Sequence, residues 1–150
     1  MSAPRTVLRP AITEDAETVA RLVAALLTEL SGTDHLPAPD LARDVLSEPG
    51  IHAMLALQEG QAVGVMLLNE CAAIYAGGRF GEITELYVLP ALRSQGIAAC
   101  LLAQAKAIAR ARGWHRLEVG APAQPDWGRT LAFYQAQGFQ EIGPRLRLLI

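Results

Sequence analysis

The chain has 150 residues, a formal net charge of −2 and a hydrophobic fraction of 51%. This length suits one domain with its own core, and the hydrophobic fraction excludes a disordered chain. Because the net charge is slightly negative, no overall positive field attracts nucleic acid, so any bound anion must be held by a local arrangement of donors. We therefore expect a single domain over residues 1–150 that does not bind nucleic acid.

The sequence carries no signal for a membrane segment, a disulfide framework or a metal site. No run reaches the roughly 18 apolar residues that a membrane-spanning helix needs. The stretch from Met1 to Arg5 lacks the apolar run of a signal peptide. The two cysteines, Cys71 and Cys100, fit no metal-ligand spacing. We expect a cytoplasmic protein that contacts no membrane and uses no metal.

Hydrophobic periodicity and turn residues predict interleaved helices and strands. In chain order, the predicted elements are a strand at 5–11, a helix capped by Thr13 and ending at Ser31–Gly32, a helix from Asp40 to about Leu46, strands at 51–57, 62–68 and 82–89, a helix from Gln95 or Gly96 to Gly113, a strand at 115–120, a helix at 127–137, and strands at 139–142 and 145–150. Residues 72–80 are expected to connect two strands. The pattern predicts an α/β fold with a mixed, mostly antiparallel central sheet of six to seven strands flanked by helices.

The most informative segment is the strand–turn–helix stretch from Glu82 to Arg112. Its turn reads Arg93-Ser94-Gln95-Gly96-Ile97-Ala98 and leads into the predicted helix. The first N–H groups of a helix lack intrahelical partners, and the helix dipole favours an anion at this end. The small residues Gly96 and Ala98 let a phosphate reach the backbone, and Arg93 adds donors. An ordinary connection between a strand and a helix explains the same glycine, so this motif alone leaves both interpretations open.

Two motifs together resemble the GNAT superfamily of N-acetyltransferases. Leu86-Tyr87-Val88-Leu89-Pro90 followed by Arg93-x-x-Gly96-x-Ala98 resembles the acetyl-CoA motif of that family. Leu131-Ala132-Phe133-Tyr134 followed by Gly138-Phe139 resembles its second motif. The order and separation of the motifs are also those of the family, and the N-terminal strand and helix fit its usual beginning. The resemblance therefore covers essentially the whole chain.

The resemblance implies an acetyl-CoA site made largely of main-chain groups. Leu86 and Val88 would offer backbone groups to the pantetheine arm and the acetyl carbonyl. The pyrophosphate would be held by the backbone N–H groups of Arg93, Ser94, Gln95, Gly96, Ile97 and Ala98. Many members have an asparagine where this chain has Trp127, and a small residue where it has Thr130. We expect Trp127 to replace the missing contact by packing on the cofactor arm.

The resemblance also places Tyr134 near the sulfur of the thioester. A phenol, with a reference pKa near 10, can protonate a departing thiolate, whose reference value is near 8.5. The alternative role of Tyr134 is that of a core aromatic on a helix face beside Phe133. The sequence leaves both roles of Tyr134 open.

An amine must lose a proton before it attacks a thioester, because a lysine-like amine has a pKa of about 10.4. Glu82 and Glu85 lie on the predicted strand that leads to the cofactor, and Glu85 is preferred because it is closer to the expected acetyl position. Strand alternation predicts that their side chains point to opposite faces, so at most one faces the cleft. Asp34, His35 and Asp126 are further ionisable candidates.

These observations predict an acetyltransferase that moves an acetyl group from acetyl-CoA to a primary amine of a small molecule or peptide, by direct attack in a ternary complex. A catalytically silent CoA-binding sensor of the same fold is one alternative. An unrelated nucleotide-binding α/β protein is another. The apolar run near the C-terminus, Leu146, Leu148, Leu149 and Ile150, could pair with a second copy at a sheet edge, so a homodimer is among the expected partners.

Overall fold

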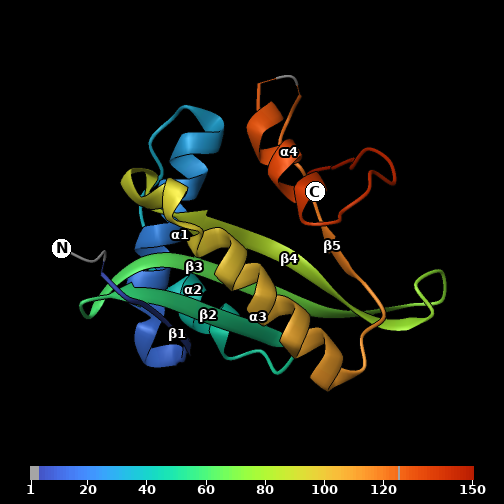
Figure 1. Cartoon of the computed structure of the whole chain (residues 1–150), viewed down its shortest axis with the longest axis horizontal. Helices are drawn as coiled ribbons and strands as arrows, with labels where there is room; N and C mark the ends of the chain where they lie inside the picture. Colours follow the sequence, from blue (N-terminus) through green and yellow to red (C-terminus); the bar gives the residue numbers. More distant parts are fainter. Residues whose placement is uncertain (1–3, 125) are drawn as a thin grey trace.

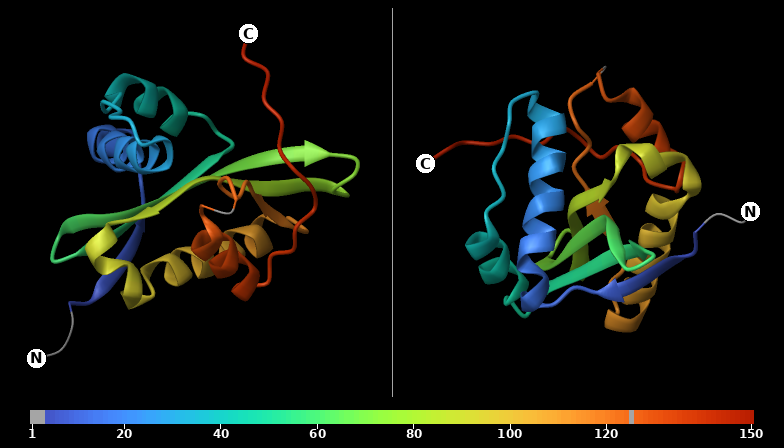
Figure 2. Two further views of the ribbon diagram at one scale, coloured as in Figure 1. Left: turned by 90° about the horizontal axis from the view of Figure 1, so that it is seen from above. Right: turned by 90° about the vertical axis from the view of Figure 1, so that its left-hand side faces the viewer.

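A five-stranded sheet lies between two helical layers in the computed structural model, which describes residues 4–124 and 126–150 (Figures 1 and 2). The first three residues of the N-terminal stretch considered above, and Pro125 in the connection before the last helix, lie outside the described residues. The strand order is β1-β2-β3-β4-β5. The first four strands pair antiparallel, and β5 pairs parallel with β4.

The strands are β1 (Thr6–Pro10), β2 (Ile51–Gln58), β3 (Gln61–Ala73), β4 (Gly78–Val88) and β5 (Leu117–Val119), and the helices are α1 (Ala16–Ser31), α2 (Pro39–Leu46), α3 (Ile97–Arg112) and α4 (Gly128–Ala136), with short 3₁₀ helices η1 (Thr13–Asp15) and η2 (Pro90–Gln95). The predicted mixed, mostly antiparallel sheet with flanking helices is confirmed. The predicted six to seven strands are wrong, because the described residues form five.

Each face of the sheet buries its own hydrophobic cluster. On one face, α1 and α2 cover a cluster that includes Leu55, Val65 and Tyr87. On the other face, α3 and α4 pack over a cluster that includes Met66 and Leu101. Alternate residues of the strands point to opposite faces, which is why the central strands are apolar on both sides. No helix among the described residues is both long enough and apolar enough to cross a bilayer.

At two helices, the N-terminus differs from the one predicted from the sequence. Thr13 opens η1 without capping α1 through its side chain; the carboxylate of Asp15 instead accepts a hydrogen bond from the Ile12 N–H and binds Arg9. The second helix begins at Pro39, one residue before the predicted cap Asp40, because proline fits the first helical position, where its missing N–H costs nothing.

The hairpin of β3 and β4 is longer than predicted. Residues 72–80 were expected to form a connection, but β3 continues to Ala73 and β4 already starts at Gly78. Only the short turn between them remains, where Gly77 and Gly78 have positive φ angles. The polar residues Asn69 and Glu70 interrupt the apolar run and look like a strand end, but tertiary partners satisfy Glu70 inside the sheet.

The two predicted C-terminal strands, at 139–142 and 145–150, are absent. Residues 139–150 follow α4 without regular structure and lie beside the sheet before leaving it (Figure 2). A strand forms only where a neighbouring backbone offers ladder partners, and this segment meets none among the described residues. Leu146, Leu148, Leu149 and Ile150 are therefore exposed.

The side chain of Glu70 anchors the end of α3 to β3. Its carboxylate accepts hydrogen bonds from Arg112 at 2.9 and 3.0 Å and from the indole N–H of Trp114 at 2.6 Å. Arg79 approaches it at 3.2 Å. The Glu70 side chain is buried, and these donors lower its pKa from 4.5 to about 2, with Arg112 the largest cause. Helix, hairpin and sheet therefore meet at one carboxylate.

We predict that Glu70→Gln lowers the melting temperature at pH 7 by about 3–6 °C, as expected for the loss of one or two charged hydrogen bonds in a chain of this length. Because the folded-state pKa is depressed, the charged network stabilises the fold fully above pH 4.5 and loses this contribution as the pH falls toward about 2. Thermal unfolding of both proteins between pH 7 and pH 2 measures this, with the exposed-carboxylate variant Glu48→Gln as control. A gap in melting temperature that stayed constant down to pH 2 would contradict the role assigned to the Glu70 charge.

Candidate functional site

The turn between η2 and α3 has the geometry expected of an anion cradle. Gly96 adopts φ +78°, and a Cβ built on it would meet no atom within 4 Å, so the space in front of this backbone is open. The first N–H bonded within the helix is that of Cys100, which donates to the carbonyl of Gly96. The N–H groups of Ile97 and Ala98 come before it and have no intrahelical partner. The predicted helix start at Gln95 or Gly96 is thus correct to within two residues.

The side chain of Arg93 does not extend toward this cradle. Its guanidinium makes a two-pronged ion pair with Glu29 of α1, at 2.5 and 2.6 Å, and its Nε donates to the carbonyl of Val88 at 3.0 Å. It also lies over the ring of Tyr87, 5.3 Å from the centroid. The side chain of Arg93 is therefore bound by Glu29, which is 64 residues away in sequence, and its donation to a phosphate stays a prediction. The hydrogen bond from Arg93 lowers the pKa of Glu29.

A second contact fixes the same loop to the sheet. The buried Gln58, at the end of β2, donates from its Nε2 to the Oε1 of Gln95 at 3.0 Å. Gln95 and Arg93 thus bind the loop to β2 and to α1, which holds its backbone N–H groups in a defined position. Sequence reasoning missed Glu29 and Gln58 because no local pattern reveals a partner so distant in the chain.

The C-terminal half of β4 has an open edge. β5 pairs with β4 only over residues 81–83, so residues 84–88 have no strand partner on that side among the described residues. The N–H of Leu89 donates to the carbonyl of Val63 on β3, and antiparallel pairs alternate, so the backbone groups of Leu86 and Val88 point away from β3 toward the open edge. Beside Leu86 and Val88, β4 therefore has a strand partner on the β3 side alone among the described residues.

A β-bulge at Thr84 overturns the prediction that Glu82 and Glu85 point to opposite faces. Glu85 pairs with Leu67 and Glu82 pairs with Asn69, two residues further along β3, so both carboxylates share one face. The extra residue Thr84 shifts the alternation by one. This face is the one covered by α1 and α2, since Leu67 belongs to that cluster.

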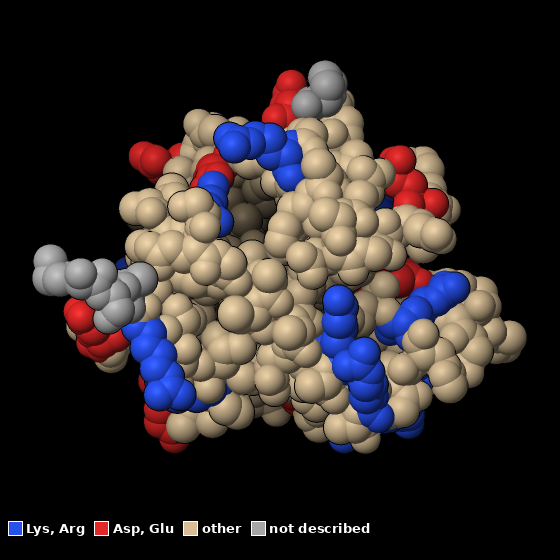
Figure 3. Space-filling model, viewed as in Figure 1, with Lys and Arg blue, Asp and Glu red and all other residues tan. Residues whose placement is uncertain are grey.

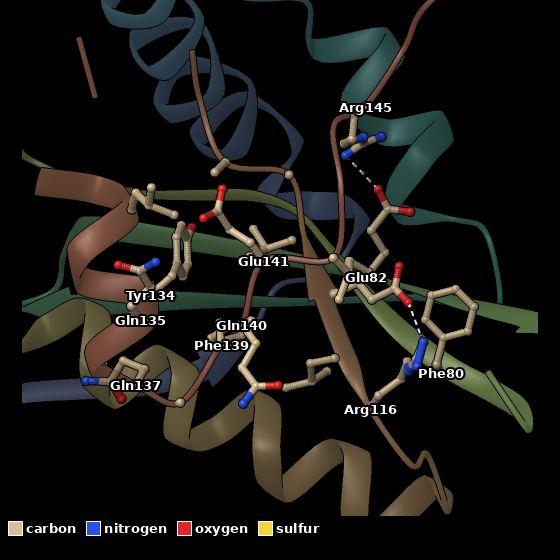
Figure 4. Close-up of a pocket in the computed structure, with 18 of the residues that line it drawn as sticks. Phe80, Glu82, Arg116, Tyr134, Gln135, Gln137, Phe139, Gln140, Glu141 and Arg145 are labelled. Carbon is tan, nitrogen blue, oxygen red and sulfur yellow. Dashed lines mark hydrogen bonds and ion pairs between the residues drawn. The ribbon is translucent and has the colours of Figure 1, made fainter. Parts of the chain in front are cut away.

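The two carboxylates have different neighbours. Glu82 forms an ion pair with Arg145 of the C-terminal segment at 3.0 Å, as the dashed line in Figure 4 shows. Glu85, which is half-buried, accepts a short hydrogen bond from the hydroxyl of the adjacent Thr84. Both therefore lie near the open edge of β4, but only Glu82 is held by a basic side chain from outside the sheet.

Tyr134 lies on the opposite side of the sheet, in the cluster under α3 and α4. It is buried and packs against Phe133 and Phe139, with ring centroids 5.5 and 5.4 Å away. Burial raises the pKa of Tyr134 to about 12, so the phenol stays protonated through the neutral range. It is part of the core beside Phe133, as one of the two interpretations predicted.

A cavity of about 1360 Å³ runs along β5 between the end of α4 and the C-terminal segment. Its lining includes both Tyr134 and Glu82 (Figure 4). The space-filling view also shows a hollow on the face seen in Figure 1, between α4 and η2, bordered by basic side chains (Figure 3). The structure therefore brings Tyr134 and Glu82 to one cavity. The loop at residues 93–98 lies at the other end of the open edge.

The other candidate residues from the sequence analysis are not among those described above at the open edge of β4. Trp127 is the N-cap residue of α4 and is half-buried, and its packing on a cofactor arm stays a prediction. His35 is exposed and its ring bonds the hydroxyl of Ser31; Asp34 and Asp126 are exposed as well. Within residues 4–124 and 126–150, no group of three or more His, Cys, Asp and Glu side chains is arranged to hold a metal ion.

Comparison with known proteins connects this geometry to a family. The family model described as Acetyltransferase (GNAT) family matches residues 19–139. An aminoalkylphosphonate N-acetyltransferase from Salmonella typhimurium is 37% identical over 134 residues, which cover 89% of this chain and 84% of that protein.

Solved structures show the same fold over almost the entire chain. A ribosomal-protein-alanine N-acetyltransferase from Brucella melitensis biovar Abortus has a TM-score of 0.76 and 25% identity, covering 96% of this chain and 99% of that one. An aminoglycoside acetyltransferase from an uncultured soil metagenomic sample has a TM-score of 0.81 and covers 97% and 99%. Its identity of 22% supports the fold alone.

Proposed function

This chain belongs to the acetyltransferase (GNAT) family, and we propose that it moves the acetyl group of acetyl-CoA directly to a primary amine of a small molecule or peptide in a ternary complex. Its relatives are N-acetyltransferases. Family membership argues against the unrelated nucleotide-binding protein considered above, and no observation supports the silent sensor. The observation that carries the proposal is the open edge of β4, which leads directly into the anion cradle of α3.

The residues of this region fit the shape and charge of acetyl-CoA. The backbone groups of Leu86 and the N–H of Val88 face the open edge, where an extended amide-containing arm can complete the ladder, whereas the Val88 carbonyl already accepts a hydrogen bond from Arg93 Nε. The open space in front of Gly96 admits a diphosphate next to the N–H groups of residues 93–98. When bound, acetyl-CoA supplies the activated acetyl carbon that the amine attacks, and CoA leaves as a thiol.

The two faces of the sheet assign different roles to the ionisable groups. Tyr134 lies on the α3 and α4 side, where its protonated phenol donates a proton or a hydrogen bond to the leaving sulfur. Glu82 and Glu85 lie on the α1 and α2 side, from which the amine approaches. Acid and base are thereby kept on opposite sides of the reacting carbon.

We assign the proton-accepting role to Glu85, with Glu82 as the second candidate. Glu85 is nearer to the backbone of Leu86, and Glu82 must first release Arg145. Catalysis also requires the substrates to be held in line, and a backbone N–H at the open edge polarises the acetyl carbonyl. The cytoplasmic location expected from the sequence stays a prediction.

The acceptor is best sought with a panel of amines. The relative from Salmonella typhimurium acts on aminoalkylphosphonates by name, so these small amines come first, followed by aminoglycosides, polyamines and a peptide that begins with alanine. Release of free thiol from acetyl-CoA reports transfer. CoA binding without thiol release for any amine would favour the silent sensor instead.

Replacement of Gly96 tests the cradle, and Gly32 offers a matched control. Both residues have φ near +75° and open space around a built Cβ, so Gly96→Leu and Gly32→Leu impose similar backbone strain. We expect only Gly96→Leu to weaken acetyl-CoA binding, by about 100-fold for the loss of about 3 kcal/mol of charged hydrogen bonds. Calorimetric titration measures affinity and thermal unfolding checks the fold. Equal affinities for the two variants would remove the basis of the proposed cofactor site.

Tyr134→Phe is expected to lower kcat by about 100-fold or more while leaving the KM for acetyl-CoA nearly unchanged, since a general acid acts mainly in the transition state. Because burial raises the pKa of Tyr134 to about 12, the wild-type kcat should not fall through ionisation of this phenol up to about pH 10. Tyr75→Phe, which removes a hydroxyl bonded to Glu118, is the control. An unchanged kcat in Tyr134→Phe would leave this side chain with a packing role alone.

Single substitutions Glu85→Gln and Glu82→Gln separate the two candidate bases. Loss of the base should lower kcat about 100-fold at pH 7, and the deficit should shrink as the pH approaches the amine pKa of about 10.4, where the amine loses its own proton. We expect this pH-dependent deficit in Glu85→Gln. The same profile in Glu82→Gln alone would move the role to Glu82, and its absence from both would assign proton removal to water.

A further inference from the structure

The side chain of Arg93 connects the two halves of the proposed cofactor site. Its backbone N–H belongs to the cradle at residues 93–98, while its side chain turns back along the chain and donates from Nε to the Val88 carbonyl at 3.0 Å. Val88 is the last residue of β4 and lies at the open edge. One side chain therefore joins the open edge to the cradle across the first turn of η2.

The carboxylate of Glu29 holds this guanidinium from α1. The ion pair is two-pronged, at 2.5 and 2.6 Å, and the guanidinium lies over the ring of Tyr87, 5.3 Å from its centroid. Helix α1 is itself fixed on the sheet through Val19 and Leu22, which belong to the same buried cluster as Tyr87. Because bidentate pairing and stacking both restrict the plane of a guanidinium, Arg93 is held in one orientation.

Stability alone does not account for this arrangement. The side chains of Arg93 and Glu29 are 42% and 30% exposed, and ion pairs in such partly solvated positions contribute little to folding. Arg9 and Asp15 form a second two-pronged pair, with both distances at 2.8 Å, at the β1 edge of the sheet, three strands away from β4. The two pairs have the same chemistry, but the Arg93 pair alone of the two contacts the end of β4.

The relative position of the open edge and the cradle determines where a bound thioester lies. The pantetheine arm and the diphosphate belong to one covalent molecule, so its far end is placed by both contacts together. If the cradle moves relative to the edge, the thioester moves along β4 past Leu86 and Glu85. A displacement of about 1 Å at the reacting atoms lowers a rate by about 100-fold.

We propose that Glu29 is a positioning residue for acetyl transfer. Acting through Arg93, it fixes the cradle relative to the open edge of β4 and thereby sets the position of the thioester; in this role it touches neither the cofactor nor the acceptor. The inference rests on the proposed function, because it requires acetyl-CoA in this site. Its expected signature is a loss of turnover rather than of affinity, since the backbone N–H groups that would hold the diphosphate remain in Glu29 variants.

Steady-state kinetics and calorimetric titration of CoA test this signature. Glu29→Gln is expected to lower kcat by about 10- to 100-fold, with KM for acetyl-CoA and Kd for CoA within about 3-fold of the wild type. Glu29→Asp keeps the charge and should recover part of kcat. Asp15→Asn removes the matched ion pair and should keep the wild-type kcat. An unchanged kcat in Glu29→Gln, or a loss confined to affinity, overturns the proposal.

A double-variant cycle tests whether Glu29 acts through Arg93. In the Arg93→Gln background, Glu29→Gln should lower kcat by less than about 2-fold, because the connection between edge and cradle is already lost. If the two substitutions instead multiply their separate effects, Glu29 acts independently of Arg93 and the proposal is wrong.

Backbone amide NMR separates this inference from the proposed function. A wild type that neither binds CoA nor releases thiol with any amine disproves the proposed function, and with it the premise of the inference. The free protein reports the positioning itself: the amide signals of residues 86–89 and 93–98 should broaden or double in Glu29→Gln but stay single in the wild type and in Asp15→Asn. Unchanged signals in Glu29→Gln overturn the inference even if the wild type transfers acetyl groups.

Discussion

The central constraint in this fold is that β4 is paired on both sides over only three residues. Residues 81–83 have β3 on one side and β5 on the other, whereas residues 84–88 have β3 alone. Backbone groups at a sheet edge inside a protein need partners. The chain leaves those of Leu86 and Val88 facing outward at the place where α3 begins. A ligand with an amide-containing arm and a diphosphate would pair with the backbone groups of this edge and with the N–H groups at the start of α3.

Anchors at both ends of β4 hold this opening. At its beginning, Trp114 packs directly on Gly81, where a Cβ would be 2.4 Å from the ring, so only glycine fits. Glu70 binds the same tryptophan and fixes the end of α3 nearby. At its end, the Arg93–Glu29 ion pair ties the cradle to α1. Because contacts within the chain hold this loop, its backbone N–H groups have a defined position without a ligand, which would reduce the entropy lost in the proposed binding of acetyl-CoA.

The bulge at Thr84 determines how the site is divided between the two faces. Without it, one of the two carboxylates would point into the cluster beneath α3 and compete with apolar side chains for that space. With it, Glu82 and Glu85 share the face of α1 and α2, whereas Tyr134 lies on the other face. One inserted residue thereby puts both carboxylates on the face opposite the phenol of Tyr134.

Local patterns were sufficient to predict most of the helices, the central strands and the glycine that begins α3. Periodicity and capping depend on neighbours in the chain, which is why Gly96 and Gly113 could be placed at the two ends of this helix. The two motifs also pointed to the family. The partner of Arg93 lies 64 positions away in the chain. The face on which Glu82 lies depends on the register of β4 against β3, and the last residues form no strand because no backbone pairs with them among the described residues. Only the tertiary structure decided these, because strand register and ion pairing are determined by which segments meet in space.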